Sequence, residues 1–382
     1  MTGPSGIRRG FSQSHNPAEA VRELHAQIAQ PDPGLVVFFC SANYNLDSLA
    51  TEIARHFPRE HTIGCTTAGE ITPIGYLDHS LTGFSIPAAE CCAVAEIIPE
   101  MSAFRMPRGH GAAEAAVTAL ARLGHSVDQK QTFAMLLSDG LSTNEEALLA
   151  SIHERIDNIP LAGGSAGDGL RLKQTFVYHG GRFHQNAALL ALVNIQHPFK
   201  IVKCQHYTGS NIRMVVTAAD PAKRIVHEIN AEPAAQEYAR IVGVDVAALT
   251  PMMFAEFPVM VRLGGDYFVR SIQKTNRDGS LTFFCAIDEG VVLTLAQRED
   301  MIENLEAFFQ DIRQEMGPPQ LVIGFDCILR SLEAEMRQVR HRASRILAAN
   351  NVIGFSTYGE QFTAMHVNQT FTAVVIGKDR AR

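Results

Sequence analysis

The sequence predicts a mixed α/β protein of two domains, the first with an internal strand-helix-strand repeat, the second partly antiparallel with an α/β ending. Three observations predict this class. The chain has 382 residues, which is more than one ordinary core organises. Patterns typical of buried strands alternate with patterns typical of amphipathic helices. A short glycine motif also occurs three times, which indicates internal repetition.

The glycine motif consists of two apolar residues, a glycine, small residues, a second glycine and a carboxylate. Its three copies are TIGCTTAGE at 62–70, LAGGSAGD at 161–168 and VIGFSTYGE at 352–360. Glycine is favoured where the backbone turns sharply or closely approaches another group. The copies therefore predict a repeated strand-to-loop unit, with Gly64, Gly163 and Gly354 at equivalent positions and with similar backbone angles.

The first domain is predicted to span residues 20–212, after a polar lead-in at 1–19. Asn16 and Pro17 form an N-cap signal with proline at the first helical position, ahead of apolar residues at helical spacing. A buried strand follows at 35–39, and Asn45 caps a second helix that ends before the first glycine motif. Together these elements make one strand-helix-strand unit.

The same order then returns. Strands are expected at 81–86 and 91–98, an alanine-rich helix at 112–123 and a strand at 133–137. Ser142 to Glu145 matches a capping box that opens a helix before the second motif. Gly180-Gly181 predicts a hairpin, with closing strands at 187–193 and 201–207.

The second domain is predicted to span residues 213–382. A helix is expected from Ala222, and Gly264-Gly265 and Asp278-Gly279 are hairpin signals for antiparallel strands. Apolar spacing then predicts a helix, a strand and a second helix before the third motif, at 298–315, 321–325 and 331–349.

Composition limits the functional classes. The formal net charge of -7 argues against a nucleic-acid or anionic-membrane surface, which needs clustered Lys and Arg. The N-terminus has no apolar signal-peptide core, and no apolar run approaches the roughly 20 residues that span a bilayer. We therefore expect a cytoplasmic protein. The seven cysteines contain no CxxC pair and lie mostly in apolar strands, as reduced thiols do.

Several segments together resemble one known family. They are 38–44 (FFCSANY), the first glycine motif, 326–330 (DCILR), the third motif and Asn368-Gln369-Thr370. On these residues the chain resembles bacterial FIST proteins, which combine a FIST N domain with a FIST C domain. The resemblance covers roughly residues 30–376 and assigns 20–212 to FIST N and 213–382 to FIST C.

The resemblance implies a sensory input protein in a two-component system and no catalysis. A free-standing member with both domains is most similar to the haem-binding, nitric-oxide-sensing FIST proteins. It would carry haem b and regulate a partner histidine kinase or another signalling protein. The sequence leaves the oligomeric state open, a homodimer included.

The haem reading needs a histidine ligand for the iron and apolar side chains for the macrocycle. His366 is the first candidate, because it precedes Asn368-Gln369-Thr370 and has Met365, Phe362 and Phe371 beside it. The glycines of the third motif, Gly354 and Gly359, complete the expected cofactor-binding set. His79 and His184 are reserve ligands, and each histidine can equally be a structural one. The same apolar neighbourhood predicts that ferrous haem binds nitric oxide but no stable dioxygen.

Two other functions remain open. The first is a sensor of a small polar ligand, such as an amino acid, held by the glycine-motif amides and by Glu70 or Glu360. The second is a serine hydrolase, because Gly163 to Gly167 matches GxSxG with Ser165 as nucleophile. In hydrolases this pattern forms a nucleophile elbow, a sharp turn that needs a helix directly after the serine. Here Asp168-Gly169 follows instead. A structural turn is therefore the favoured interpretation of that match.

The predicted helix at 331–349 is the one concentrated positive segment of this acidic chain. Its basic residues are Arg337, Arg340, His341, Arg342 and Arg345. They are interpreted as a solvated face, with docking of a kinase as the alternative.

Overall fold

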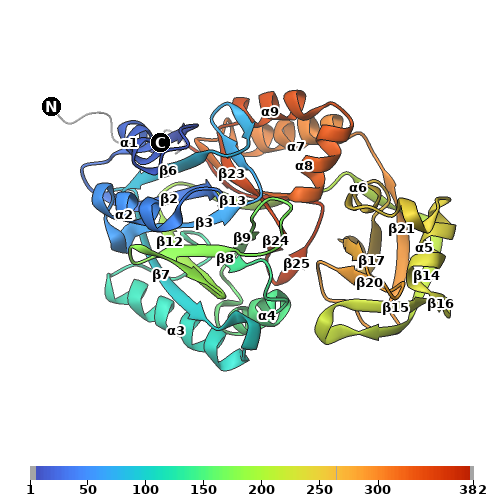
Figure 1. Cartoon of the computed structure of the whole chain (residues 1–382). Helices are drawn as coiled ribbons and strands as arrows, with labels where there is room; N and C mark the ends of the chain where they lie inside the picture. Colours follow the sequence, from blue (N-terminus) through green and yellow to red (C-terminus); the bar gives the residue numbers. More distant parts are fainter. Residues whose placement is uncertain (1–5, 264, 379–382) are drawn as a thin grey trace.

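The computed structural model describes residues 6–263 and 265–378. Three similar α/β units and one inserted antiparallel domain make up this part of the chain (Figure 1). Each unit has the order edge strand, helix, strand, helical segment, strand, hairpin and closing strand. The mixed α/β class is therefore confirmed, and the repeat that the glycine motifs indicated has three members.

Unit 1 consists of β1 (Arg8–Ser12), α1 (Pro17–Ile28), β2 (Pro33–Ser41), α2 (Leu46–His56), β3 (Thr62–Thr67), β4 (Glu70–Thr72), β5 (Gly75–Leu77) and β6 (Leu81–Pro87). Unit 2 consists of β7 (Cys91–Pro99), α3 (Met106–Arg122), β8 (Thr132–Asp139), α4 (Glu145–Ile156), β9 (Leu161–Ala166), β10 (Phe176–His179), β11 (Arg182–Gln185) and β12 (Ala187–Ile195). Unit 3 consists of β13 (Phe199–Cys204), α7 (Met301–Met316), β22 (Leu321–Cys327), α8 (Ile328–Met336), α9 (Arg340–Ala349), β23 (Val352–Thr357), β24 (Glu360–Phe362), β25 (Met365–Val367) and β26 (Phe371–Ile376).

The units are joined by an exchange of hairpins. The sheet orders are β1-β6-β2-β3-β10-β11, β7-β12-β8-β9-β24-β25 and β13-β26-β22-β23-β4-β5. In each sheet the last two strands are a hairpin from another unit, so unit 2 contributes to unit 1, unit 3 to unit 2, and unit 1 to unit 3. The three units therefore close into a ring, and the C-terminal segment shares backbone hydrogen bonds with both N-terminal units.

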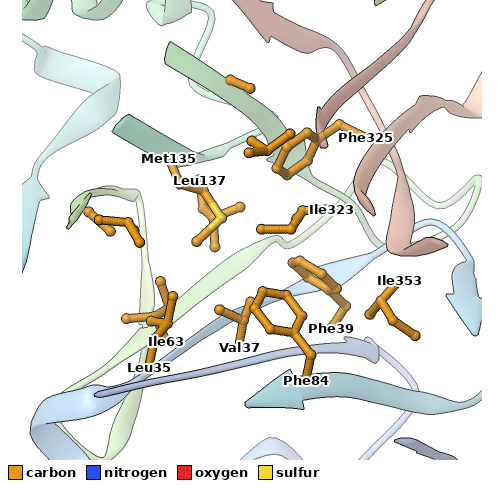
Figure 2. Packing of buried hydrophobic residues seen from close by; sticks show 14 of the residues in the cluster. Leu35, Val37, Phe39, Ile63, Phe84, Met135, Leu137, Ile323, Phe325 and Ile353 are labelled. Carbon is orange, nitrogen blue, oxygen red and sulfur yellow. The ribbon is translucent and has the colours of Figure 1, made fainter. Parts of the chain in front are cut away.

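The inner faces of the three sheets share one apolar core (Figure 2). It includes Val37 and Phe39 of β2, Met135 of β8 and Phe325 of β22, all fully buried. The outer face of each sheet is covered by its own helices: α1 and α2 on unit 1, α3 and α4 on unit 2, and α7 and α9 on unit 3. Successive strand residues alternate between these two layers, as the period-2 geometry of strands requires.

The inserted domain lies between β13 and α7 and stands to one side of the ring (Figure 1). Its elements are β14 (Tyr207–Asp220), β15 (Ile225–Ile229), β16 (Glu232–Pro233), α5 (Ala234–Val242), α6 (Pro251–Glu256), β17 (Val259–Leu263), β18 (Asp266–Arg270), β19 (Ile272–Thr275), β20 (Leu281–Phe283) and β21 (Val292–Arg298). We call this segment, 207–298, the insert. The predicted boundary at 212–213 falls inside β14.

Several local predictions are confirmed. Asn16 and Asn45 cap α1 and α2 through their side-chain oxygens. The Gly180-Gly181 turn has positive φ at both residues, as a two-residue hairpin between right-handed strands requires. The Asp278-Gly279 signal joins β19 to β20. Part of the Gly264-Gly265 signal lies outside the described residues.

Other local predictions are wrong. The lead-in contains β1, which pairs with β6. No helix begins at Ala222, because the chain makes one 3-10 turn there and then enters β15. The capping box is absent: Asn144 is the N-cap and makes no side-chain cap bond. The helix expected at 331–349 breaks into α8 and α9 at Gln338, whose φ is +57°.

The first glycines of the three motifs are equivalent, as predicted. Each is the third residue of its strand and aligns with the neighbouring parallel strand at Phe38, Leu136 or Gly324. A Cβ on Gly64, Gly163 or Gly354 would lie 2.4, 2.0 or 1.9 Å from the carbonyl oxygen of that partner. They lie within strands and not at the strand-to-loop transition. Close backbone approach, and not a turn, is therefore what requires glycine here.

Candidate functional site

The three glycine motifs meet where β3, β9 and β23 end. Backbone hydrogen bonds join them in pairs: the Ala68 amide donates to Ser356, the Gly167 amide to Thr66, and the Ser165 amide to Gly359, at 2.9, 3.0 and 2.9 Å. In open α/β sheets ligands bind outside the carboxyl ends of the strands. The meeting point of the motifs is therefore the first place where a ligand site is expected.

A pocket of about 390 Å³ opens at this meeting point. It is lined by the segment after β2 (41–43), the first motif (67–70), the bend before β6 (78–79) and the loop after β9 (168–171). We call it the Glu70 pocket. Its walls carry acidic, basic and hydroxyl groups and few large apolar side chains, so it suits a small polar molecule.

Glu70 is the most deeply buried ionisable group of this pocket. Its carboxylate accepts hydrogen bonds from the Ser80 amide and hydroxyl at 2.9 and 2.7 Å, and from the Thr67 hydroxyl. Burial raises the pKa of Glu70 to about 7, although these hydrogen bonds act in the opposite direction. The side chain therefore changes charge near neutral pH, which makes it sensitive to a bound cation.

The Glu70 pKa leads to a prediction about stability. The usual pKa of a glutamate is 4.5, and that of folded Glu70 is about 7. Between these pH values Glu70 keeps its proton in the folded protein and loses it in the unfolded chain. This contribution to stability is complete below pH 4.5 and is lost as the pH rises through 7, by about 3 kcal/mol in all. Glu70→Gln removes the titrating group. The unfolding free energy of wild type minus that of Glu70→Gln should therefore decrease as the pH is raised from 5 to 8.

The exposed Glu114 of α3 supplies the control. Glu114→Gln should keep the pH dependence of wild type. A difference between wild type and Glu70→Gln that is flat from pH 5 to pH 8 would contradict the burial argument.

The loop after β9 brings opposite charges to the pocket. Asp168 accepts backbone hydrogen bonds from Leu172 and Lys173 at 2.8 and 3.0 Å, and one from the Tyr358 hydroxyl. Burial opposes its ionisation, but these bonds outweigh burial and hold the pKa of Asp168 below its usual value. Arg171 donates from Nε to the Asp168 carbonyl at 2.8 Å. The pocket thus has a fixed carboxylate beside a half-exposed guanidinium.

Comparison with protein families decides the identity of the chain. Residues 34–232 match the FIST N domain, and residues 234–363 match the FIST C domain. The chain belongs to the FIST family. A search of curated proteins finds no match. The FIST N match covers unit 1 from β2 onward, unit 2, β13 and the start of the insert, and the FIST C match covers the rest of the insert and most of unit 3.

The predicted FIST cofactor ligand, His366, lies in β25 and is buried. Neither ring nitrogen has a hydrogen-bond partner, and burial lowers the pKa of His366, so the ring is neutral. Its ring packs against Gly359, where an added Cβ would lie 2.2 Å from Cε1. The lining of the Glu70 pocket does not include His366.

Of the other predicted haem contacts, Gly359 lies against the His366 ring, and the remaining ones pack elsewhere. Met365 and Phe362 pack on the core of the insert, whereas Phe371 is in the layer beneath α7. Gly354 faces the backbone of Gly324. The imidazole has the right chemistry for an iron ligand, although the side chains predicted to flank the macrocycle face other layers of the fold. The part of the chain that the structure describes also contains no cluster of three or more His, Cys, Asp or Glu placed to hold a metal ion.

The reserve histidines lie elsewhere. His79 lines the Glu70 pocket and its ring nitrogen bonds with the Asn43 side chain. His184 lies in β11 and bonds with the His179 carbonyl at 3.1 Å. Of the three histidines that the sequence offered as iron ligands, His79 is the one that lines the Glu70 pocket.

Glu360 is the unit 3 counterpart of Glu70. It accepts hydrogen bonds from the Thr370 amide and hydroxyl at 3.1 and 2.7 Å, and it is fully buried. Nearby, the Gln369 side chain donates to the Phe254 carbonyl of α6 at 3.4 Å, so the insert covers this side of unit 3. The sequence offered Glu70 and Glu360 as carboxylates for a polar ligand. Of these two, Glu70 lines the pocket described above.

Ser165 does not have the placement of a nucleophile elbow. It is fully buried inside β9. Its hydroxyl shares a hydrogen bond with the Ser138 hydroxyl at 3.1 Å and accepts one from the Gln361 side-chain amide at 3.0 Å. A loop follows β9 and no helix starts there. The GxSxG match is therefore a consequence of the repeated glycine motif.

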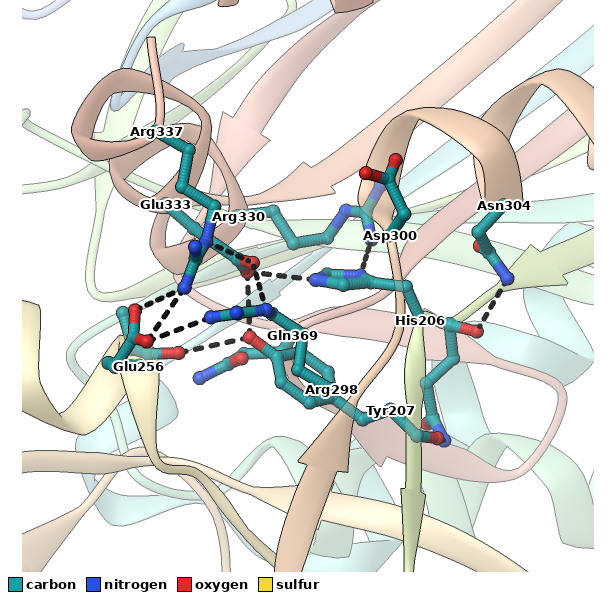
Figure 3. Close-up of polar contacts among 12 residues, drawn as sticks. His206, Tyr207, Glu256, Arg298, Asp300, Asn304, Arg330, Glu333, Arg337 and Gln369 are labelled. Atoms are coloured by element: carbon teal, nitrogen blue, oxygen red, sulfur yellow. Dashed lines mark hydrogen bonds and ion pairs between the residues drawn. The ribbon is translucent and has the colours of Figure 1, made fainter. Parts of the chain in front are cut away.

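A buried polar network attaches the insert to unit 3 (Figure 3). Glu333 of α8 accepts from His206 Nε2 and the Tyr207 hydroxyl at 2.8 and 2.7 Å, and Arg330 donates to His206 Nδ1 at 2.6 Å. Burial lowers the pKa of His206, so the imidazole is neutral with its proton on Nε2. Tyr76, from the hairpin that carries Glu70, reaches the same network through Asp326 at 2.5 Å. Only the fold joins these four segments.

The basic helix of the sequence is only partly free. Arg337 pairs with Glu256 and Arg340 with Asp78. Arg342 and Arg345 of α9 line a groove with Arg313 of α7. Across residues 6–263 and 265–378, no helix is long and apolar enough to cross a membrane.

Proposed function

We propose that this FIST protein is a signal-transduction sensor whose ligand is a small zwitterion, such as an amino acid, bound in the Glu70 pocket. One observation carries the proposal: a buried carboxyl group poised near neutral pH and a guanidinium line one pocket beside the point where the three glycine motifs meet. The output would be a change in a partner signalling protein such as a histidine kinase, which is the role that the family resemblance implies.

The pocket offers both halves of a zwitterion a partner. An ammonium group would lie toward the carboxylates of Glu70, Asp78 and Asp168, and a carboxylate toward Arg171. An opposite charge a few ångströms away favours the ionised form of an acid. Binding would therefore lower the pKa of Glu70 and release a proton near pH 7, which calorimetry in buffers of different ionisation enthalpy measures.

The test is a thermal-unfolding screen of the twenty amino acids with the whole protein. A ligand at 100 times its Kd stabilises the folded state by about 2.7 kcal/mol, so at least one amino acid should raise the Tm clearly. Arg171→Gln should abolish this shift. Arg182→Gln, at an exposed position of β11, is the matched control and should keep it. Ligands that stabilise wild type and Arg171→Gln equally would refute binding in this pocket.

The haem-based nitric oxide sensor is the second candidate. Its support is the family resemblance together with the two buried, unpartnered ring nitrogens of His366. Protein purified from haem-supplied cells should then show a Soret band that His366→Ala loses. A colourless wild-type protein, or a Soret band that His366→Ala retains unchanged, would exclude His366 as the ligand.

A further inference from the structure

A second pocket lies in the insert, far in the sequence from the glycine motifs. Its volume is about 580 Å³, within the range of sites for small organic molecules. Three arginines line it: Arg213 of β14, Arg262 of β17 and Arg270 of β18. We call it the arginine pocket. We propose that it binds an organic carboxylate with an apolar body, a ligand distinct from that of the Glu70 pocket.

The pocket exists because two strands separate. The ladder between β17 and β21 contains only Val259 with Leu295 and Met260 with Thr294. Beyond these pairs β17 continues to Leu263 without a ladder to β21, while β21 stays paired with β14 along its other edge. Side chains from both faces of the sheet therefore line the gap. On β14 a register shift between Gly209 and Arg213 disturbs the ladder beside the pocket, and such bulges re-aim side chains.

The charge in the pocket is not balanced. Among the described residues, Arg213, Arg262 and Arg270 make no ion pair with a carboxylate, and Asp288 is the one acidic residue in the lining. Arg213 and Arg262 are exposed and Arg270 is half-buried, whereas the fully buried Arg224 and Arg330 each pair with a carboxylate. Uncompensated guanidinium groups gathered at one cavity of an acidic protein favour an anionic ligand.

The three guanidinium groups are held in different ways. Arg270 is half-buried and donates to the His366 carbonyl at 3.0 Å. This bond holds Arg270 against unit 3. Arg262 donates to the Gly265 carbonyl at 3.3 Å and lies 5.8 Å from the centre of the Tyr267 ring. These contacts leave guanidinium N–H donors on both residues. The planar guanidinium group matches a carboxylate in a two-pronged hydrogen bond.

The remaining walls define the body of the ligand. They are mostly apolar: Val261, Leu263, Tyr267, Ile287, Val291 and Val292. Leu263 and Val292 are 47% and 48% exposed, so an apolar ligand would cover surface that now faces water. An inorganic anion or a sugar phosphate would leave these walls uncovered. An alkyl or aryl carboxylate uses both the arginines and the apolar wall.

The test is calorimetry on the whole protein with decanoate as the probe. Decyltrimethylammonium, with the same chain and the opposite charge, is the matched ligand control. We expect decanoate to bind at one site and the cation at least ten times more weakly. The double variant Arg213→Gln/Arg262→Gln should weaken decanoate at least tenfold. Arg277→Gln, at an exposed position in the β19–β20 turn, should bind like wild type.

A second variant keeps the proposal testable if the double arginine variant fails to fold. Val292→Glu places a carboxylate in the pocket at an exposed position and should also lose decanoate. Equal affinity for both detergents, unchanged decanoate affinity in both variants, or no binding at millimolar decanoate would overturn the proposal. Glu70→Gln should keep full decanoate affinity, so failure here is separable from failure of the Glu70 pocket.

Discussion

Gly354→Ala is expected to prevent stable folding or to lower the unfolding free energy by more than about 3 kcal/mol, as overpacking and backbone displacement in a core do together. An alanine Cβ would lie 1.9 Å from the Gly324 carbonyl oxygen and 2.6 Å from its carbonyl carbon. Both atoms are backbone in the centre of a sheet, where no side chain can rotate aside. The measurement is the yield of soluble protein and, where it folds, chemical unfolding.

Gly111 in α3 is the matched control. A Cβ there meets nothing within 4 Å, and alanine stabilises a helix interior by about 0.5–1 kcal/mol relative to glycine. Gly111→Ala should therefore unfold at a slightly higher denaturant concentration than wild type. The same large loss is expected for Gly163→Ala, whose Cβ would lie 2.0 Å from Leu136. Wild-type stability in Gly354→Ala would show that the β22–β23 pairing is looser than described.

Arg224→Met is expected to cost about 3–5 kcal/mol, the range for removing one partner of a buried ion pair. Arg224 of the insert is 4% exposed and contacts two glutamates in the first turn of α4, with Glu145 at 2.6 Å and Glu146 beside it. Without the guanidinium, two carboxylates remain close together, one of them fully enclosed. The insert should then loosen from unit 2.

The neighbouring Lys223 is the control for this prediction. Its side chain is 72% exposed and pairs with Asp220, and exposed pairs contribute about 0–1 kcal/mol. Lys223→Met should therefore unfold close to wild type. Limited proteolysis adds a second readout, because cleavage within the insert should accelerate in Arg224→Met alone. Equal unfolding free energies for the two variants would remove the ion cluster as the clamp between insert and ring.

The two proposed ligand sites lie on different parts of the molecule, one on the ring and one on the insert. The Glu70 pocket is built from loops of units 1 and 2, and the arginine pocket lies wholly within the insert. They are connected through unit 3: Tyr76 reaches Asp326 from the Glu70 hairpin, and Arg270 bonds with the His366 backbone. If both proposals hold, a FIST protein of this form would bind two different ligands on separate domains.

Some local features of this protein could be predicted from the sequence alone. Asn16 and Asn45 cap their helices because a short side-chain oxygen can satisfy a free amide within the first turn. The three motif glycines are equivalent because each faces a backbone carbonyl of the parallel strand beside it. Such features depend on a few neighbouring residues, so periodicity and residue type suffice to find them. The same short-range information failed at Ala222 and at Gln338, where packing against other elements decided between helix and strand or broke a helix.

Only the tertiary structure decided which hairpin joins which sheet. The strands β4, β5, β24 and β25 have three residues each, too few for their own pattern to specify a partner, so their pairing follows from the closing of the ring. This pairing sets Asp168 and Arg171 beside Glu70 and encloses His366 against Gly359. The insert likewise brings Arg224 to Glu145 and Glu146 from about eighty residues away. Charge and hydrogen-bond partners at such separations are determined by the fold, because no sequence spacing encodes them.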